Sequence, residues 1–193
     1  MRDVDHCAVS RALSLVGKGT YVLGAGNYRP IVEGKATKDT LPNSSVPIID
    51  WPWTPREIKG RAIYDASDCW GYVAWCHKQD RHLPGYNKGG SVVDWVNCDS
   101  AIEDARGKKQ LWDLVTVGGP RPGDIVVYPS IRKLGVRIRI GHVGIIVAVP
   151  ADYAGDLSTL TVVQCQSSSR PAVQQTNGAL WQRRKGLVLR VVA

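Results

Sequence analysis

The chain has 193 residues, of which 44% are hydrophobic and 22% are charged, a balance typical of a globular protein rather than a disordered one. Its 25 lysines and arginines against 17 acids give a net charge of +8, which favours an anionic partner such as nucleic acid, a membrane surface or a bacterial wall polymer. No apolar run approaches the roughly 18 residues of a transmembrane helix, and acids precede the first apolar residues, unlike in a secretion signal.

The N-terminal third begins with a predicted helix and continues into a long irregular segment. Apolar residues recur at helical spacing over residues 4–16, and this pattern makes Cys7 a small core residue. The segment Tyr21–Gly26 follows as a glycine-containing turn. Periodicity then disappears over residues 27–61, where prolines surround two tryptophans. We expect a packed insertion there, and whether it covers a binding cleft stays open.

A second helix is predicted over residues 66–78, with Ser67 or Asp68 as its N-cap. Cys69 and Cys76 lie on one side of this helix, about 10 Å apart along its axis, so they cannot form a disulfide within it.

The remainder of the chain predicts one more helix and then a set of strands. A capping-box pattern at 91–94 opens a helix that carries Val92, Trp95, Val96 and Cys98 inward. Helices followed by strands predict an α+β fold, an antiparallel sheet with helices packed to one side, in a single domain over residues 1–193. The predicted strands are Ile125–Tyr128, Val136–Ile140, Gly141–Val149, Leu160–Gln166 and Leu187–Val192.

Cys69 differs from the other cysteines in its position. The five cysteines show no spacing typical of a disulfide framework or a zinc site, so we expect reduced thiols. Cys69 occupies the first turn of its predicted helix, where free amides and the helix dipole favour an anion. That setting lowers a thiol pKa and supplies an oxyanion hole, so Cys69 is a candidate nucleophile.

His142 is the candidate base, although a single strand histidine is more often a buried core residue. If residues 150–157 join two antiparallel strands, paired positions sum to about 307, and His142 lies opposite position 165 within one residue. Gln164 or Gln166 then lies beside the imidazole and can orient it, which completes a nucleophile–base–orienter triad. The alternative is that both glutamines face solvent.

Four motifs occur in the order found in one enzyme family. They are Tyr21-Val-Leu-Gly24, Asp68-Cys-Trp-Gly71, Pro122-Gly-Asp124 and Gly141-His-Val-Gly-Ile145. Together they span roughly residues 10–168 and resemble the NlpC/P60 family of papain-like cysteine peptidases. The resemblance implies a papain-like fold and hydrolysis of amide bonds in bacterial cell-wall peptides.

The resemblance also implies roles for individual residues. Cys69 would be the nucleophile, His142 the general base and Gln164 the third polar residue, with Gln166 as its alternative. Tyr21 would line the cleft and Asp68 would hold a substrate ammonium group. The candidate substrate-binding residues are Tyr21, Asp68, Trp70 and Gly141. The chain departs from the family pattern in three ways: Trp70 replaces a serine, the orienting residue is a neutral glutamine, and the insertion is long.

The leading hypothesis is therefore a cysteine hydrolase, an endopeptidase or amidase that cleaves peptidoglycan stem peptides. We expect a monomer that needs no cofactor or metal and binds no specific nucleic acid. We also expect it to be made in the cytoplasm and to reach the wall after lysis, injection or non-classical release. A second hypothesis is a non-catalytic wall-binding or phage-particle protein on the same fold. Nucleic-acid binding rests on charge alone, without a supporting motif.

Overall fold

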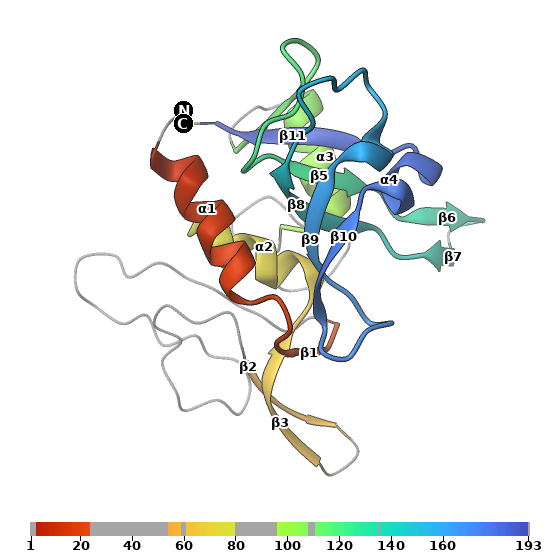
Figure 1. Cartoon of the computed structure of the whole chain (residues 1–193). Coiled ribbons are helices and arrows are strands. Elements are labelled where there is room, and N and C mark those ends of the chain that lie inside the picture. Colours follow the sequence, from red (N-terminus) through yellow and green to blue (C-terminus); the bar gives the residue numbers. More distant parts are fainter. Residues whose placement is uncertain are drawn as a thin grey trace, which may run out of the picture.

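A six-stranded antiparallel sheet forms the centre of the protein (Figure 1). The computed structural model describes residues 3–23, 54–58, 61–79, 96–107, 111–134 and 136–192. The spatial order of the strands is β10–β9–β8–β5–β11–β4, so the chain crosses back and forth between the middle and the edges. The strands are β4 (Trp112–Leu114), β5 (Ile125–Tyr128), β8 (His142–Ala148), β9 (Thr161–Cys165), β10 (Val173–Asn177) and β11 (Leu187–Val191).

Three helices cover one face of this sheet. They are α1 (Asp3–Ser14), α2 (Cys69–His77) and α3 (Cys98–Arg106), and their buried side chains share a core cluster with the odd-numbered residues of β5, Ile125 and Val127. Side chains alternate between the faces of a strand, so Val126 and Tyr128 belong to a second cluster on the opposite face. The α+β architecture predicted from the order of the elements is therefore confirmed.

The opposite face of the sheet is covered as well, which the sequence analysis did not predict. The helix α4 (Ala179–Arg183) and the 3₁₀ turn η1 (Leu157–Thr159) pack there, on the other side of the sheet from α1 and α2 (Figure 1). Trp181 is the central side chain of this layer and is completely buried. The expectation that helices lie on one side only was thus incomplete, because five residues are too few for a recognisable helical repeat.

A second, three-stranded sheet has the order β1–β3–β2, with β1 (Thr20–Tyr21), β2 (Thr54–Ile58) and β3 (Arg61–Ser67). Two of these strands contradict the predicted loop over residues 27–61, because that range contains β2 and the first residue of β3. Pro55 is tolerated in β2 because β2 is an edge strand. The rest of the insertion, residues 27–53 and 59–60, lies outside the described residues.

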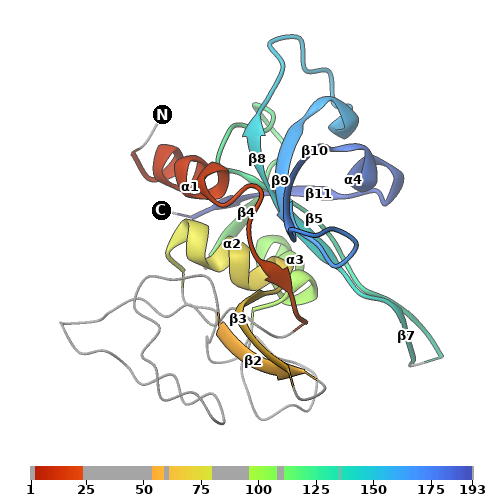
Figure 2. The same ribbon diagram turned by 60° about the horizontal axis from the view of Figure 1, so that its bottom comes forward.

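The two-stranded hairpin of β6 (Ile131–Lys133) and β7 (Val136–Arg139) extends away from the body of the protein (Figure 2). It contains the strand predicted at 136–140, and its apolar residues Val136, Ile138 and Ile140 are exposed. Within the described segments, no helix is both long enough and apolar enough to cross a bilayer.

Two details of the predicted helices were wrong. Cys7 is exposed, because α1 turns Ala8 and Ala12 toward the core, and Cys7 is one position, about 100°, away from Ala8. The helix α2 begins at Cys69 rather than at residue 66, since β3 continues to Ser67.

The helix α3 follows the position at which a helix was predicted to open, residues 91–94. Residues 91–95 lie outside the described residues, and α3 starts at Cys98 with Asn97 as its N-cap. The Asn97 side chain accepts a hydrogen bond from the Ser100 amide, and the Ser100 hydroxyl accepts one from the Asn97 amide. This reciprocal capping box sets the start of α3 and leaves Cys98 buried, as predicted.

The turn before β5 is held by an ion pair between a buried carboxylate and a partly exposed guanidinium. The Arg190 guanidinium, on β11, donates two hydrogen bonds to the carboxylate of Asp124, at 2.8 and 2.7 Å. The same carboxylate accepts a hydrogen bond from the Arg121 amide and is 2% exposed. The aspartate of the Pro122-Gly-Asp124 motif thus has a structural role: it joins β5 to β11.

We expect Asp124→Ala to lower the free energy of unfolding by about 2–3 kcal/mol, because it leaves the Arg190 guanidinium without its bidentate carboxylate. Asp113→Ala is the matched control, since Asp113 is an exposed carboxylate on neighbouring β4. That change should cost no more than about 0.5 kcal/mol in urea unfolding. Equal losses for the two variants would show that the Asp124–Arg190 pair does not stabilise the fold.

Candidate active site

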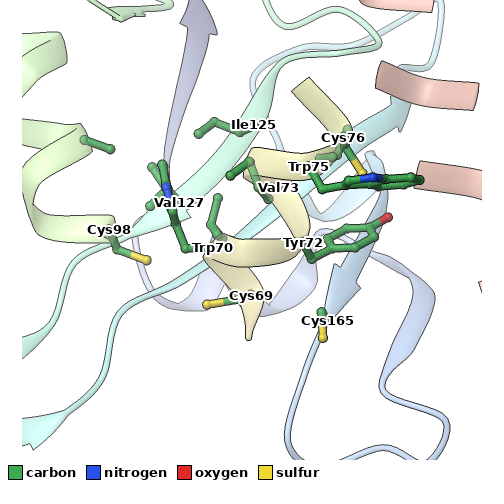
Figure 3. Packing of buried hydrophobic residues seen from close by; sticks show 14 of the residues in the cluster. Cys69, Trp70, Tyr72, Val73, Trp75, Cys76, Cys98, Ile125, Val127 and Cys165 are labelled. Carbon is green, nitrogen blue, oxygen red and sulfur yellow. The ribbon is translucent and has the colours of Figure 1, made fainter. Parts of the chain in front are cut away.

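Cys69 is the first residue of α2, and its surroundings are those of a buried helix N-terminus. Asp68 caps the helix, with its Oδ1 accepting a hydrogen bond from the Gly71 amide at 2.8 Å. All residues of α2 are buried between α1 and the sheet, and Cys69 is 5% exposed (Figure 3). The partial positive charge of the helix N-terminus is therefore available to the sulfur in an environment with little water.

His142 is the first residue of β8 and hydrogen-bonds with Cys69. Its Nε2 lies 2.7 Å from Oε1 of Gln164, whose own Nε2 donates to the Thr176 hydroxyl at 2.9 Å. Because the glutamine oxygen can only accept, Nε2 of the imidazole carries the proton in this bond. The other ring nitrogen, Nδ1, is left for Cys69.

The sheet register puts position 166 opposite His142 and both glutamines on its face, and the hydrogen bond to the imidazole identifies Gln164 as the partner. The strands β8 and β9 are antiparallel, and Ile145 pairs with Val163, so paired positions sum to 308 rather than 307. Gln164 is 2% exposed, which rules out the alternative that it faces solvent. Gln166 instead donates to the Ser169 hydroxyl at 2.7 Å, and it lines the hollow in front of the imidazole.

The thiol and the imidazole shift each other's protonation. Hydrogen bonds from Cys98 and from His142, together with the charge of His142, lower the pKa of Cys69 below its ordinary value, against the opposing effect of burial. Burial alone lowers the pKa of His142, but contact with Cys69 and with Gln164 outweighs burial and raises it. The pair therefore favours a thiolate beside an imidazolium.

Aromatic side chains hold the His142 ring in place. The Trp181 ring stacks on it, with centroids 5.7 Å apart and planes 20° apart, and the Tyr128 ring lies 6.0 Å away. A tryptophan face also attracts a cation, which favours the protonated imidazole. A Cβ on Gly144 would lie 2.6 Å from Cγ1 of Val162 and 3.0 Å from the Trp181 ring, so this glycine makes room for the tryptophan. Sequence analysis missed Trp181. The small residue Gly144, two positions after His142, was the only sign that a large side chain packs there.

Tyr21 reaches the same site from another sheet. The strand β1 runs parallel to β3 and pairs Tyr21 with Ser67, which brings its side chain beside α2. The Tyr21 hydroxyl hydrogen-bonds with Cys69, and burial and the charge of Cys69 raise its pKa, so it remains a phenol that can donate. Tyr21, Tyr128, His142 and Gln166 line a hollow of about 170 Å³.

The other three predicted substrate-binding residues are firmly packed. Asp68 is buried as the helix cap, and Trp70 packs edge-to-face on Trp112 with ring centroids 5.8 Å apart. A Cβ on Gly141 would lie 2.8 Å from both the Cys98 Cβ and the Tyr128 carbonyl oxygen. These contacts give each residue a structural role, and their part in substrate binding stays a prediction.

The chain matches the CHAP domain family over residues 60–166. It belongs to this family. CHAP domains are papain-like cysteine amidase domains related to NlpC/P60, and they are generally hydrolases that act on peptidoglycan. The sequence resemblance thus led to a related family and to the same class of chemistry. The matched range contains Cys69, His142 and Gln164, and comparison with curated proteins finds no match to the chain.

The pKa shifts predict a distinctive pH dependence for alkylation of Cys69 by iodoacetamide. Because only the thiolate reacts and the Cys69 pKa is lowered, the rate should stay high as the pH falls below the usual thiol range. It should drop only when the pH passes the lowered pKa. Peptide mapping by mass spectrometry would follow Cys76 as a control, since burial raises its pKa.

In His142→Ala the pH at which Cys69 alkylation drops should move upward, because the imidazolium no longer stabilises the thiolate. Equal rates for Cys69, Cys76 and Cys98 near neutral pH would instead favour the non-catalytic binding protein.

Proposed function

We propose that this CHAP protein hydrolyses an amide bond in peptidoglycan stem peptides, as an endopeptidase or an amidase. The observation that carries the proposal is the arrangement of Cys69, His142 and Gln164. Cys69 lies at a helix N-terminus in contact with the imidazole, and Gln164 binds the far side of that ring. Family membership supports peptidoglycan as the substrate class.

The first half of the reaction follows from the protonation states. The Cys69 thiolate attacks the amide carbonyl, and the developing oxyanion is stabilised by the amides at the start of α2. The Tyr21 hydroxyl, which contacts the sulfur, is a further donor near the reacting atoms. The His142 imidazolium then protonates the leaving amine, and an acyl-enzyme remains on Cys69.

In the second half, His142 is neutral and acts as the base. It takes a proton from water, which attacks the acyl-enzyme and releases the carboxylate product. Gln164 acts through His142: it holds the ring in the orientation that presents Nδ1 to the sulfur. A neutral amide stabilises the imidazolium less than a carboxylate would, and the stacked Trp181 ring supplies part of the difference.

A thiolate–imidazolium pair favours catalysis over simple binding. Burying two opposite charges costs desolvation free energy, and a wall-binding protein gains nothing from that cost. The net charge of +8 fits an anionic wall polymer as the binding partner. We therefore propose that it acts at the cell wall. We also treat residues 1–193, with the insertion at about 27–61, as a single domain.

Cys69→Ala should abolish the release of new amino groups from purified peptidoglycan, because it removes the thiolate that attacks the amide carbonyl. Mass spectrometry of the soluble muropeptides would identify the bond that the native protein cleaves. Cys76→Ser is the matched control, since Cys76 is a buried thiol on the same helix. Undiminished amine release by Cys69→Ala would refute the proposal.

Gln164→Ala should lower kcat by about 10- to 100-fold, because the imidazole loses the partner that fixes its orientation. In Gln166→Ala the main change should be in KM, since Gln166 lines the hollow and does not bind the ring. Kinetics of the two variants on one muropeptide would separate these roles. If the fall in kcat occurs in Gln166→Ala instead, Gln166 is the orienting residue.

A further inference from the structure

A second thiol, that of Cys98, lies next to the Cys69 sulfur. Both cysteines are the first residues of their helices, and both are buried, at 5% and 6% exposure. Figure 3 shows their sulfurs directed toward one gap between α2 and α3, and the two side chains hydrogen-bond there. In hydrolysis Cys98 helps to keep Cys69 deprotonated, but it takes no part in the bonds that form and break.

The contacts around Cys98 fix it against the strand that carries His142. The Asp99 carboxylate accepts a hydrogen bond from the Ser130 amide at 2.7 Å, and the Ser130 hydroxyl accepts one from the Gly141 amide at 3.1 Å. The absence of a side chain on Gly141 leaves room for the Cys98 Cβ. The two sulfurs are thus held together by the same elements that position the imidazole.

We propose that Cys98 is the resolving thiol of Cys69: when a peroxide oxidises Cys69, Cys98 captures it in a reversible Cys69–Cys98 disulfide. That this disulfide blocks hydrolysis rests on the proposed function, because it assumes that Cys69 is the nucleophile. Formation of the disulfide itself does not rest on it.

The chemistry balances with hydrogen peroxide as the oxidant. The Cys69 thiolate attacks one peroxide oxygen, the O–O bond breaks, and the departing hydroxide takes the proton of the His142 imidazolium to form water. The product is a Cys69 sulfenic acid. The Cys98 sulfur then attacks the Cys69 sulfur, the S–O bond breaks, and the Cys98 proton leaves with the hydroxide as a second water. The two sulfurs together give up two electrons, and the peroxide accepts them.

The first step also prepares the second. In the reduced protein the pKa of Cys98 is raised, mainly because Cys98 hydrogen-bonds to the Cys69 thiolate and secondly because it is buried. A sulfenic acid is neutral, so oxidation of Cys69 removes that contribution and the pKa of Cys98 falls. Cys98 therefore becomes a better nucleophile at the moment when it is needed.

The geometry selects Cys98 over the other three thiols. Cys76 lies two turns along α2 from Cys69, about 10 Å away along the axis. Cys165 donates to the Ser67 carbonyl oxygen at 3.7 Å, and Cys7 is exposed on α1. If Cys98 has only a structural role, it fills the space beside Gly141, and the products of Cys69 oxidation should be the same with and without the Cys98 thiol.

The test treats the reduced full-length chain with hydrogen peroxide, blocks remaining thiols with iodoacetamide and maps the tryptic peptides by mass spectrometry. The expected product joins the peptide of residues 62–78 to that of residues 89–106. The first peptide holds both Cys69 and Cys76, so fragment spectra must assign the bond to Cys69. Labelling of Cys69 should be lost completely after peroxide and restored completely by dithiothreitol.

In Cys98→Ala, peroxide should carry Cys69 on to the sulfinic acid, and dithiothreitol should not restore its labelling. Cys98→Ser repeats this test with a side chain closer in size, and Cys76→Ser should behave like the native chain. A bond from Cys69 to Cys76 or Cys165, or equal recovery with and without Cys98, would overturn the proposal. Because these readouts do not depend on hydrolysis, a chain that forms the bond but cleaves no peptidoglycan would refute only the proposed function.

Discussion

The contact between the Cys69 thiol and the His142 imidazole is the interaction that the rest of the site serves. Burial by itself opposes a charge on either group, and their proximity, together with the hydrogen bonds from Cys98 and with Gln164, makes the charged forms favourable. Loss of one partner would leave the other as an unpaired group in a region with little water, which costs several kcal/mol. The fold must therefore bring the end of α2 and the start of β8 together and hold them there.

Several elements share this task, each by a different physical means. The Asp68 cap fixes where α2 begins and so where the sulfur lies. Gln164, on β9, binds the far side of the imidazole through a hydrogen bond. The Trp181 ring stacks on the imidazole from the opposite layer of the fold and limits its rotation. The imidazole is thus oriented from both of its polar ends and from one of its faces.

Cys98 affects both the reactivity of the Cys69 thiolate and the outcome of its oxidation. A sulfur that is kept deprotonated is a better nucleophile toward an amide, and it is also more readily oxidised. The S–H group of Cys98 stabilises the thiolate, and its position next to the same sulfur lets it react with the oxidised form. The start of α3, set by the Asn97 capping box, is therefore as much a part of the site as the start of α2.

The sequence by itself determined the local features: a cap of α2 at Ser67 or Asp68, the positions of the strands β5, β8 and β9, and a glutamine, Gln164 or Gln166, beside His142. These follow from spacing along the chain. Tertiary structure alone decided that α1 turns Cys7 to solvent, that α3 begins at Cys98, and that Trp181 and Cys98 reach the site. Several faces or caps were locally equivalent at each of these positions, and the choice among them depended on the partner against which each element packs.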